Sequence, residues 1–343
     1  MRTPIPSVYV QGLGSYAPSR ILANEELASI VDTSDEWIIT RSGIRERHIA
    51  APDETGADMA AKAAQAALAD AHISPEDIDL LIVATVSDDT PVPSVACRVH
   101  SKIGLKSGVP AFDITAACSG FIYLLQIANH MLRAGDYRRA LVIATEKLSR
   151  ITDWTDRSTC VLFGDAAGAA VLAKCDIPHA GILGNVLGAD GTKGDLLAVN
   201  PRNAPAPVFP AALPSGTHTI AMNGREVFKN AVRVMSQACR SVLAKCATDP
   251  AQLALIIPHQ ANIRIIEAIS DELKIPLSRF KINLDRYGNT SAASIPLALD
   301  EAYRAGEIKE GDLVLLVAFG GGFTWGASLI RWQKNPEKTT PAL

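Results

Sequence analysis

Cys118 is the residue whose setting most suggests covalent chemistry. It comes shortly after the strand-like segment 111–114 and opens an apolar helical stretch, and its neighbours are small: Ala116, Ala117, Ser119 and Gly120. A cysteine at a helix N-terminus meets unpaired N–H groups and the positive end of the helix dipole, which lowers the thiol pKa below about 8.5. The sequence therefore predicts a reactive thiol open to a substrate. A buried structural cysteine between a strand and a helix would show the same pattern.

His259 and Asn289 follow the same logic in the second half of the chain. His259 comes directly after an apolar segment, 253–257, and Pro258; Asn289 follows Gly288 and precedes a helix of small residues. Ligands of α/β proteins bind where strands end, so these side chains are candidates for one site. Taken alone, the histidine could be structural and the asparagine a helix cap.

A glycine run, 320–322, follows the apolar segment 313–319. Backbone N–H groups of consecutive glycines can face a ligand without obstruction by a Cβ atom. Such donors are what an oxyanion hole requires. A tight turn between two strands is the alternative interpretation.

Composition excludes several classes of protein. The 343 residues are 48% hydrophobic and 20% charged, with a formal net charge of −3, which is globular and lacks the basic excess of a nucleic-acid-binding protein. The six cysteines form no C-x-x-C pair and fit no zinc template. The N-terminus has no apolar signal segment and the apolar runs are short, so we expect a cytoplasmic protein with free thiols and no membrane span.

The elements that must position these residues alternate between two kinds. Short β-branched runs alternate with Ala/Leu-rich stretches, which predicts an α/β fold whose sheet is covered on both faces. Strands are expected at 7–13, 80–85, 111–114, 140–145, 160–172, 253–257, 313–319 and 325–331. Helices are expected at 57–71, 94–103, 118–134, 224–246, 262–273 and 291–305.

An internal repeat indicates that the chain is duplicated. Segments 66–85 and 241–260 both run from a helix end through a proline to an apolar strand. Pro75 and Gly135 are 60 positions apart and Pro250 and Gly311 are 61 apart, so two anchors keep their spacing. We predict an N-terminal half, 1–179, carrying the cysteine and a C-terminal half, 180–343, carrying the histidine and asparagine. In this repeat Asn289 would occupy the position in the second half that corresponds to Cys118 in the first. Chance likeness between strand–helix units is the alternative.

Six motifs, spread in order over nearly the whole chain, resemble the 3-oxoacyl-(acyl-carrier-protein) synthase III family. They are DTSDEWIITRSGIRERHI (32–49), AACSGF (116–121), TDRSTCVLFGDAAGA (155–169), HQANIRII (259–266), GNTSAASIPLAL (288–299) and AFGGGFTWGASLIRW (318–332). The resemblance implies a five-layered αβαβα thiolase-like fold and a homodimer. It also implies an acyltransferase that starts fatty acid synthesis, by decarboxylative Claisen condensation of a primer acyl-CoA with malonyl-acyl carrier protein.

The resemblance assigns roles to individual residues. Cys118 resembles the acyl-accepting nucleophile, and His259 and Asn289 resemble the pair that stabilises charge during decarboxylation. The backbone N–H groups of Cys118 and Gly321 resemble the oxyanion hole. The products would be 3-oxoacyl-acyl carrier protein, CoA and CO2. No metal or other cofactor is implied, because acyl-CoA is a substrate.

Further residues resemble the family's binding positions. Trp37 and Arg157 match the pair that stacks on the adenine of CoA, Arg41 a contact to its phosphates, and Arg264 the anchor for the acyl carrier protein. Val92 falls where a bulkier residue often reaches across the dimer to floor the acyl pocket, which suggests a primer longer than acetyl.

Two other positions depart from the family's pattern. Ser42 replaces a common threonine, and Arg225 replaces a usual asparagine near the pantetheine path. A solvated arginine at a helix start is an equal interpretation of Arg225, and a contact to an acidic primer, a CoA phosphate or the carrier protein is the other.

Three other functions compete. A condensing enzyme of secondary metabolism, using a longer primer, would keep the same residues. A thiolase or hydroxymethylglutaryl-CoA synthase would share the fold, but a thiolase needs a second cysteine that segment 318–325 lacks. A non-catalytic partner subunit would usually have lost the nucleophile, and Cys118 is present.

Overall fold

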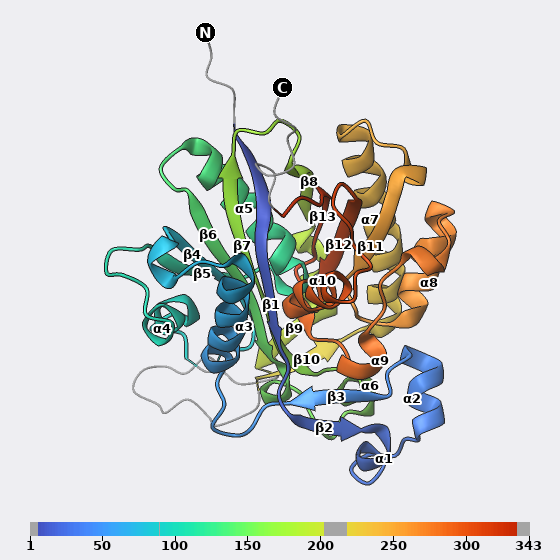
Figure 1. The fold of residues 1–343 in the computed structure, drawn as a ribbon. Helices are drawn as coiled ribbons and strands as arrows, with labels where there is room; N and C mark the ends of the chain where they lie inside the picture. The colour runs from blue at the N-terminus through green and yellow to red at the C-terminus, as the bar shows by residue number, and fades with distance from the viewer. Residues whose placement is uncertain (1–5, 89, 202–217, 335–343) are drawn as a thin grey trace.

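The structure is a computed structural model that describes residues 6–88, 90–201 and 218–334 (Figure 1). Its strands are β1 (Ser7–Tyr16), β2 (Arg20–Ala23), β3 (Glu46–Ile49), β4 (Leu80–Ala84), β5 (Ala111–Ile114), β6 (Arg139–Lys147), β7 (Asp165–Cys175), β8 (Gly181–Ala189), β9 (Leu197–Pro201), β10 (His218–Met222), β11 (Leu253–Pro258), β12 (Leu313–Gly320) and β13 (Thr324–Arg331). Its α-helices are α1 (Asn24–Leu27), α2 (Asp35–Ser42), α3 (Gly56–Ala71), α4 (Val95–Lys102), α5 (Gly120–Ala134), α6 (Arg157–Cys160), α7 (Gly224–Lys245), α8 (Ile263–Leu273), α9 (Leu284–Tyr287) and α10 (Ser294–Arg304).

Helices and sheets alternate in five layers (Figure 1). Helices α3 and α4 pack on the outer face of the strands of the first half, and α7, with α8 beside it, packs on the outer face of β8, β12 and β13. Helices α5 and α10 lie between the two sets of strands and contact both. This is the predicted αβαβα thiolase-like architecture, and the α/β fold class is confirmed.

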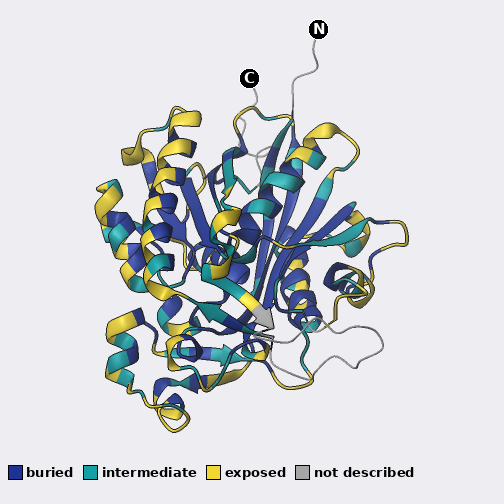
Figure 2. Ribbon diagram, turned by 180° about the vertical axis from the view of Figure 1, so that it is seen from behind, coloured by how far each residue is buried: buried dark blue, intermediate teal, exposed yellow. Residues whose placement is uncertain are grey.

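Strands are buried on both faces because helices cover both. In β6, Ala140, Val142 and Ala144 belong to the core around α5 and α10, whereas Leu141 and Ile143 belong to the core under α3 and α4. Side chains alternate across a strand, so a continuous apolar run is what a doubly covered strand needs. Figure 2 shows the central strands largely dark blue, with the exposed residues mainly on the outer helices and on loops.

The predicted elements are found with small shifts at their ends, but one strand begins later than expected. The run 160–172 was expected to be one strand, whereas β7 begins at Asp165. Residues Arg157–Cys160 instead form the short helix α6, which Asp156 caps by accepting the Ser158 N–H at 2.9 Å. The sequence prediction contained no strand at β8, whose glycines weaken the signal, and no helix at α2, which Ser34 caps.

Two sets of strands repeat one spatial order. Hydrogen bonding links the strands as β11-β12-β13-β8-β1-β7-β6-β4-β5, with Val8 of β1 opposite Gly181 of β8 where the two sets meet. The first set consists of β1, β4, β5, β6 and β7, numbered here one to five along the chain. Its spatial order β5-β4-β6-β7-β1 is therefore third, second, fourth, fifth and first. The second set matches it, with an isolated bridge between Ile256 and Phe280 in place of its third strand. This match supports a boundary near residue 180, and the predicted division remains a prediction.

Candidate active site

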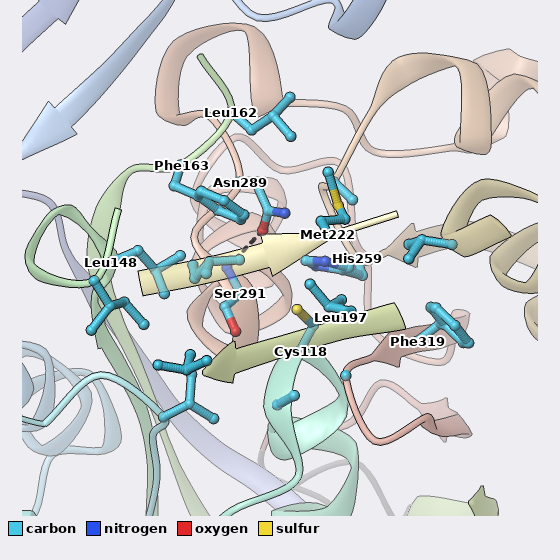
Figure 3. Close-up of a pocket in the computed structure, with 18 of the residues that line it drawn as sticks. Cys118, Leu148, Leu162, Phe163, Leu197, Met222, His259, Asn289, Ser291 and Phe319 are labelled. Carbon is cyan, nitrogen blue, oxygen red and sulfur yellow. Dashed lines mark hydrogen bonds between the residues drawn. The ribbon is translucent and has the colours of Figure 1, made fainter. Parts of the chain in front are cut away.

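Cys118, His259 and Asn289 line one cavity of about 1270 Å³. Three separate elements carry them: the 3-10 turn Ala117–Ser119 before α5, the residue after β11, and the segment between α9 and α10. In Figure 3 the three side chains point into a common space beneath the β9–β10 ribbon. The structure therefore brings together the three residues that the sequence singled out.

A sharp turn aims Cys118 into the cavity. Ala117 holds a left-handed φ of +46°, which is uncommon for a residue with a Cβ atom and lets β5 turn abruptly toward α5. The cysteine is partly exposed, whereas His259 and Asn289 are buried. Burial raises the pKa of the Cys118 thiol to about 12, although hydrogen bonding to Ser291 opposes the rise. The prediction of a lowered pKa is therefore wrong, because desolvation outweighs the effect of the helix terminus.

His259 is a neutral imidazole held from behind. Its backbone N–H donates to the Val317 carbonyl of β12 at 2.8 Å, and its Nδ1 lies 2.7 Å from the Ser294 hydroxyl. Burial lowers the pKa of the ring to about 3, so the imidazole carries no charge at neutral pH. With Nδ1 occupied, Nε2 is the ring nitrogen left for the cavity.

Asn289 is fixed by its backbone and by its own side-chain oxygen. Its N–H donates to the Leu162 carbonyl at 2.8 Å and its carbonyl accepts the Gly164 N–H at 3.1 Å. The side-chain Oδ1 accepts the Ser291 N–H at 2.9 Å. Because that partner is a donor, the oxygen must face it. The Nδ2 amide group is thereby left as a donor on the cavity side.

Glycine is required beside the nucleophile. A Cβ atom built on Gly320 would stand 2.5 Å from the Cys118 backbone nitrogen, so the end of β12 packs directly against the turn. Gly321 lines the same cavity. These contacts place the glycine run beside the Cys118 backbone.

Cationic and aromatic residues gather at the cavity mouth. Trp37 and Arg41 line it, and the guanidinium carbons of Arg41 and Arg157 lie 5.9 and 5.0 Å from the Trp37 ring centroid. Arg225 and Arg264 also line the cavity and are exposed. A protein of net charge −3 thus concentrates positive charge at this opening.

Arg157 lies directly on Trp37 rather than across a gap from it. Its Nη1 donates to the Asp32 carbonyl at 2.7 Å, and Arg157 does not line the cavity, whereas its neighbour Ser158 does. A base stacked between the two would need the arginine to move away from the ring.

Val92 does not enter the cavity of its own chain. Its exposed fraction is 82%, the largest among the exposed apolar residues of the described part. A side chain so exposed is compatible with a place in the pocket of a second copy. Segment 200–214, which is rich in proline and alanine and whose composition favours a surface excursion, lies almost entirely outside the described residues.

In the structure Asn289 is not the residue of the second half that corresponds to Cys118. Ala117 and Ser291 are the matching residues: each opens a 3-10 turn, with φ of +46° and +47°, and each turn leads into a helix that starts three residues later. Ala292 is therefore the counterpart of Cys118, and Asn289 that of Thr115.

Three polar residues around the site escaped the sequence analysis. Ser291 lines the cavity, Ser294 contacts His259, and Glu146 is fully buried behind Ser291, whose hydroxyl donates to Glu146 Oε1 at 3.1 Å. The one available signal was weak: Glu146 lies between Thr145 and Lys147, just after the apolar run of β6, yet belongs to the same strand.

No group of three or more metal-ligating side chains occurs within residues 6–88, 90–201 and 218–334. Within the same ranges no helix has the length and apolar character to cross a membrane.

Comparisons with known proteins agree on one family. A family model described as 3-oxoacyl-[acyl-carrier-protein] synthase III matches residues 112–191, and one for its C-terminal part matches residues 243–332. A beta-ketoacyl-[acyl-carrier-protein] synthase III from Caldanaerobacter subterraneus is 51% identical over 95% of this chain and 98% of its own length.

Solved structures give the same picture. The 3-oxoacyl-[acyl-carrier-protein] synthase III of Aquifex aeolicus is 48% identical, covers 95% of this chain and 100% of its own, and superposes with a TM-score of 0.88. The priming beta-ketosynthase of the R1128 polyketide pathway also has a TM-score of 0.88, at 35% identity, and covers 98% of this chain and 99% of its own.

Proposed function

The chain belongs to the 3-oxoacyl-[acyl-carrier-protein] synthase III family, and we propose that it condenses a primer acyl-CoA with malonyl-acyl carrier protein. The products are 3-oxoacyl-acyl carrier protein, CoA and CO2, and the reaction starts fatty acid synthesis. The observation that carries this proposal is the meeting of Cys118, His259 and Asn289 in one cavity. Relatives that are 46–51% identical to this chain are named beta-ketoacyl-[acyl-carrier-protein] synthase III, which favours this role over one in secondary metabolism.

In the first half-reaction the Cys118 sulfur attacks the thioester carbonyl of the primer. An acyl-Cys118 intermediate forms and CoA leaves. The oxyanion of the tetrahedral intermediate would accept hydrogen bonds from the backbone N–H groups of Cys118 and Gly321, which is why the glycine run must pack so closely. The thiol is neutral at pH 7, so attack has to be coupled to loss of its proton.

In the second half-reaction malonyl loses CO2 and negative charge grows on the thioester oxygen. Asn289 Nδ2 and His259 Nε2 donate to that oxygen. For His259 this requires the proton on Nε2, and Ser294 sets that tautomer by donating to Nδ1 while it accepts the Gln260 N–H at 3.4 Å. Preorganised donors in a dry site are worth about 3 kcal/mol each in such reactions. The enolate then attacks the acyl-Cys118 carbonyl.

The mouth of the cavity binds the two carriers. Trp37 and Arg157 hold the adenine of CoA after Arg157 swings from the ring, Arg41 contacts the phosphates, and Arg264 anchors the acidic acyl carrier protein. Arg225 adds positive charge at the same opening. No cofactor takes part in this chemistry. We also propose that the protein is a cytoplasmic homodimer and that each of its two chains consists of the halves 1–179 and 180–343.

Primer length is set by Val92 of the second copy. Its small side chain leaves room beyond acetyl, and its exposure in the single chain leaves it free to enter a neighbouring pocket. A series of acyl-CoA primers from acetyl to octanoyl tests this point: a product distribution restricted to acetyl would contradict it.

The decisive experiment is to trap the intermediate. We expect incubation with a pool of acyl-CoA primers, followed by intact-protein and peptide mass spectrometry, to show one acyl adduct on Cys118. Cys118→Ala is the control and should carry none. An acyl group on any other of the six cysteines, or none on the wild-type protein, would contradict the proposed function.

A further inference from the structure

Glu146 is a carboxyl group that the proposed chemistry leaves unused. It lies on β6 with an exposed fraction of 0%, and no ion pair to it occurs among the described residues. A buried carboxylate without a cationic partner is costly, so such a group calls for an explanation.

A hydroxyl connects this carboxyl group to the nucleophile. Ser291 Oγ donates to Glu146 Oε1 at 3.1 Å, and the same hydroxyl lies beside the Cys118 thiol (Figure 3). The left-handed φ of Ser291 and the 2.9 Å bond from its N–H to Asn289 hold it there. Cys118, Ser291 and Glu146 therefore form a path from the cavity to a buried acid.

The other carboxyl oxygen is held by donors only. Ser87 Oγ donates to Glu146 Oε2, and the Val86 N–H does so at 3.2 Å. These bonds fix the carboxyl group so that Oε1 faces Ser291. The carboxyl group is thus oriented toward the nucleophile from behind.

The charged groups nearby are engaged elsewhere. Lys147 Nζ donates to the carbonyl oxygens of Ala51 and Glu54 at 2.9 and 2.7 Å. Asp165 of β7 accepts from Ser149 and from the Ala50 N–H, and Asp88 pairs with Arg98. The charge of Glu146 contributes to the raised pKa of Cys118.

We propose that Glu146 accepts the proton of the Cys118 thiol through the Ser291 hydroxyl when the thiol attacks the primer thioester. The Sγ–H proton passes to Ser291 Oγ while the Ser291 proton passes to Glu146 Oε1. The Sγ–C bond forms, the bond from carbon to the CoA sulfur breaks, and the CoA thiolate takes a proton from water. This relay rests on the proposed role of Cys118 and adds a positioning residue that never touches the substrate.

The same path returns the proton at the end of the cycle. When the enolate attacks the acyl-Cys118 carbonyl, the carbon–carbon bond forms and the bond from carbon to Sγ breaks. The Cys118 thiolate that leaves recovers its proton from neutral Glu146 through Ser291. Glu146 is again a carboxylate, and the enzyme is restored with protons and charges balanced.

The pKa of the Glu146 carboxyl group is suitable for a proton acceptor. Burial raises the pKa of its carboxyl group to about 7, against the opposing effect of the hydrogen bonds from Ser87 and Val86. A proton acceptor works best when its pKa lies near the working pH. Burial likewise raises the pKa of the Cys118 thiol, and the negative charge of Glu146 raises it further.

The relay is tested by the pH dependence of Cys118 reactivity, read by two probes. Alkylation by iodoacetamide reports on the thiol alone, and burst formation of the acyl-enzyme from the pool of acetyl- to octanoyl-CoA reports on the proposed reaction. We expect wild-type rates to rise with pH through the ionisation of Glu146. Glu146→Gln should lose this inflection and slow both reactions about 100-fold at pH 7. Ser291→Ala interrupts the path with the carboxyl group still present and should do the same.

Ser87→Ala is the control that separates a relay from a structural effect. It removes a hydrogen bond that favours the ionised carboxylate and leaves the path to Cys118 intact. We expect the inflection to move to higher pH in this variant and not to disappear. An unchanged wild-type profile in Glu146→Gln and Ser291→Ala would overturn the relay. Absence of acyl-enzyme in the wild-type protein would instead overturn the proposed function, and alkylation would still decide the relay.

Discussion

Gly320 and Cys118 pack directly against each other, backbone to backbone, at the edge of the active site. A Cβ atom built on Gly320 would lie 2.5 Å from the Cys118 nitrogen and 3.1 Å from its Cβ atom. The end of β12 thus touches the turn that presents the nucleophile. The strand of one half fixes the nucleophile of the other.

Gly320→Ala should therefore displace Cys118 while the fold survives. Contacts below 3 Å cannot be kept, so either the turn or the end of β12 must shift, and a misplacement of 1 Å costs about 100-fold in rate. Burst kinetics of acyl-enzyme formation measure this loss. Gly191→Ala is the matched control, because a Cβ atom there meets nothing within 4 Å and no such loss is expected.

Asn289→Asp separates the two half-reactions. The aspartate keeps an oxygen for the Ser291 N–H but replaces the Nδ2 donor with a second acceptor. We expect malonyl decarboxylation to fall about 100-fold or more, because the developing negative charge loses a donor and meets a like charge. Acyl-enzyme formation should change much less. Equal losses in release of CO2 and in acylation of Cys118 would argue against this division of roles.

Ser294→Ala tests whether the serine sets the tautomer of His259. Without the hydroxyl 2.7 Å from Nδ1, the proton is no longer held on Nε2, and we expect decarboxylation to slow about 10-fold, the scale of one orienting hydrogen bond. Burial lowers the ring pKa to about 3, so the decarboxylation rate of the wild-type protein should show no histidine ionisation between pH 5 and 8. Nitrogen chemical shifts of the ring report both features. Ser270→Ala, which removes a buried hydroxyl bonded to Ile275, should leave the rate unchanged.

The sequence predicted best what rests on hydrophobic pattern. Continuous apolar runs such as Leu313–Gly320 identified doubly covered strands, and matched spacings at Pro75 and Pro250 indicated duplication. The motifs around Cys118, His259 and Asn289 identified the cavity, because they stand where strands end. The Gly-rich β8 was not predicted, since its pairing with β13 and not its own propensity makes it a strand.

Properties that depend on three-dimensional surroundings were beyond the sequence. The helix-start position of Cys118 suggested a low pKa, but desolvation by residues distant in sequence decides the outcome. The link from Ser291 to Glu146 joins residues 145 positions apart. Equivalence of Asn289 and Cys118 was also wrong, by three residues, because the repeat is set by the left-handed residues Ala117 and Ser291.

Arg264→Glu probes the cationic mouth. The side chain is exposed and lines the cavity, so charge reversal should weaken binding of the acidic carrier protein without touching the reacting atoms. We expect KM for malonyl-acyl carrier protein to rise about 10-fold or more, with acyl-enzyme formation nearly unchanged, and the difference to shrink as salt is added. Lys309→Glu, an exposed charge reversal away from the cavity, is the control. An equal rise in both variants would show a mere effect of net charge.

Glu146→Gln should reveal the ionisation of Glu146 in the stability of the fold. Burial raises the folded-state pKa from 4.5 to about 7, so the folded protein binds more protons than the unfolded chain in this window. The contribution of Glu146 to the free energy of unfolding is fully present below pH 4.5. It is lost as pH rises through 7, and the loss amounts to up to about 3 kcal/mol. Glutamine does not titrate, so the variant should gain stability relative to wild type between pH 4.5 and 7 and then hold it.

Urea unfolding at fixed protein concentration measures the difference between the two free energies of unfolding. Glu54→Gln is the matched control. Burial alone would raise the pKa of Glu54, but hydrogen bonds from Lys62 and Tyr16 outweigh it and lower the pKa. The stability that Glu54 contributes is therefore present above its unfolded pKa of 4.5 and stays constant toward pH 7. The free energy of unfolding of Glu54→Gln relative to wild type should stay constant over the pH range in which that of Glu146→Gln increases. A flat profile for both variants would mean that Glu146 does not take up a proton near neutral pH, and the proton of Cys118 would then need another acceptor.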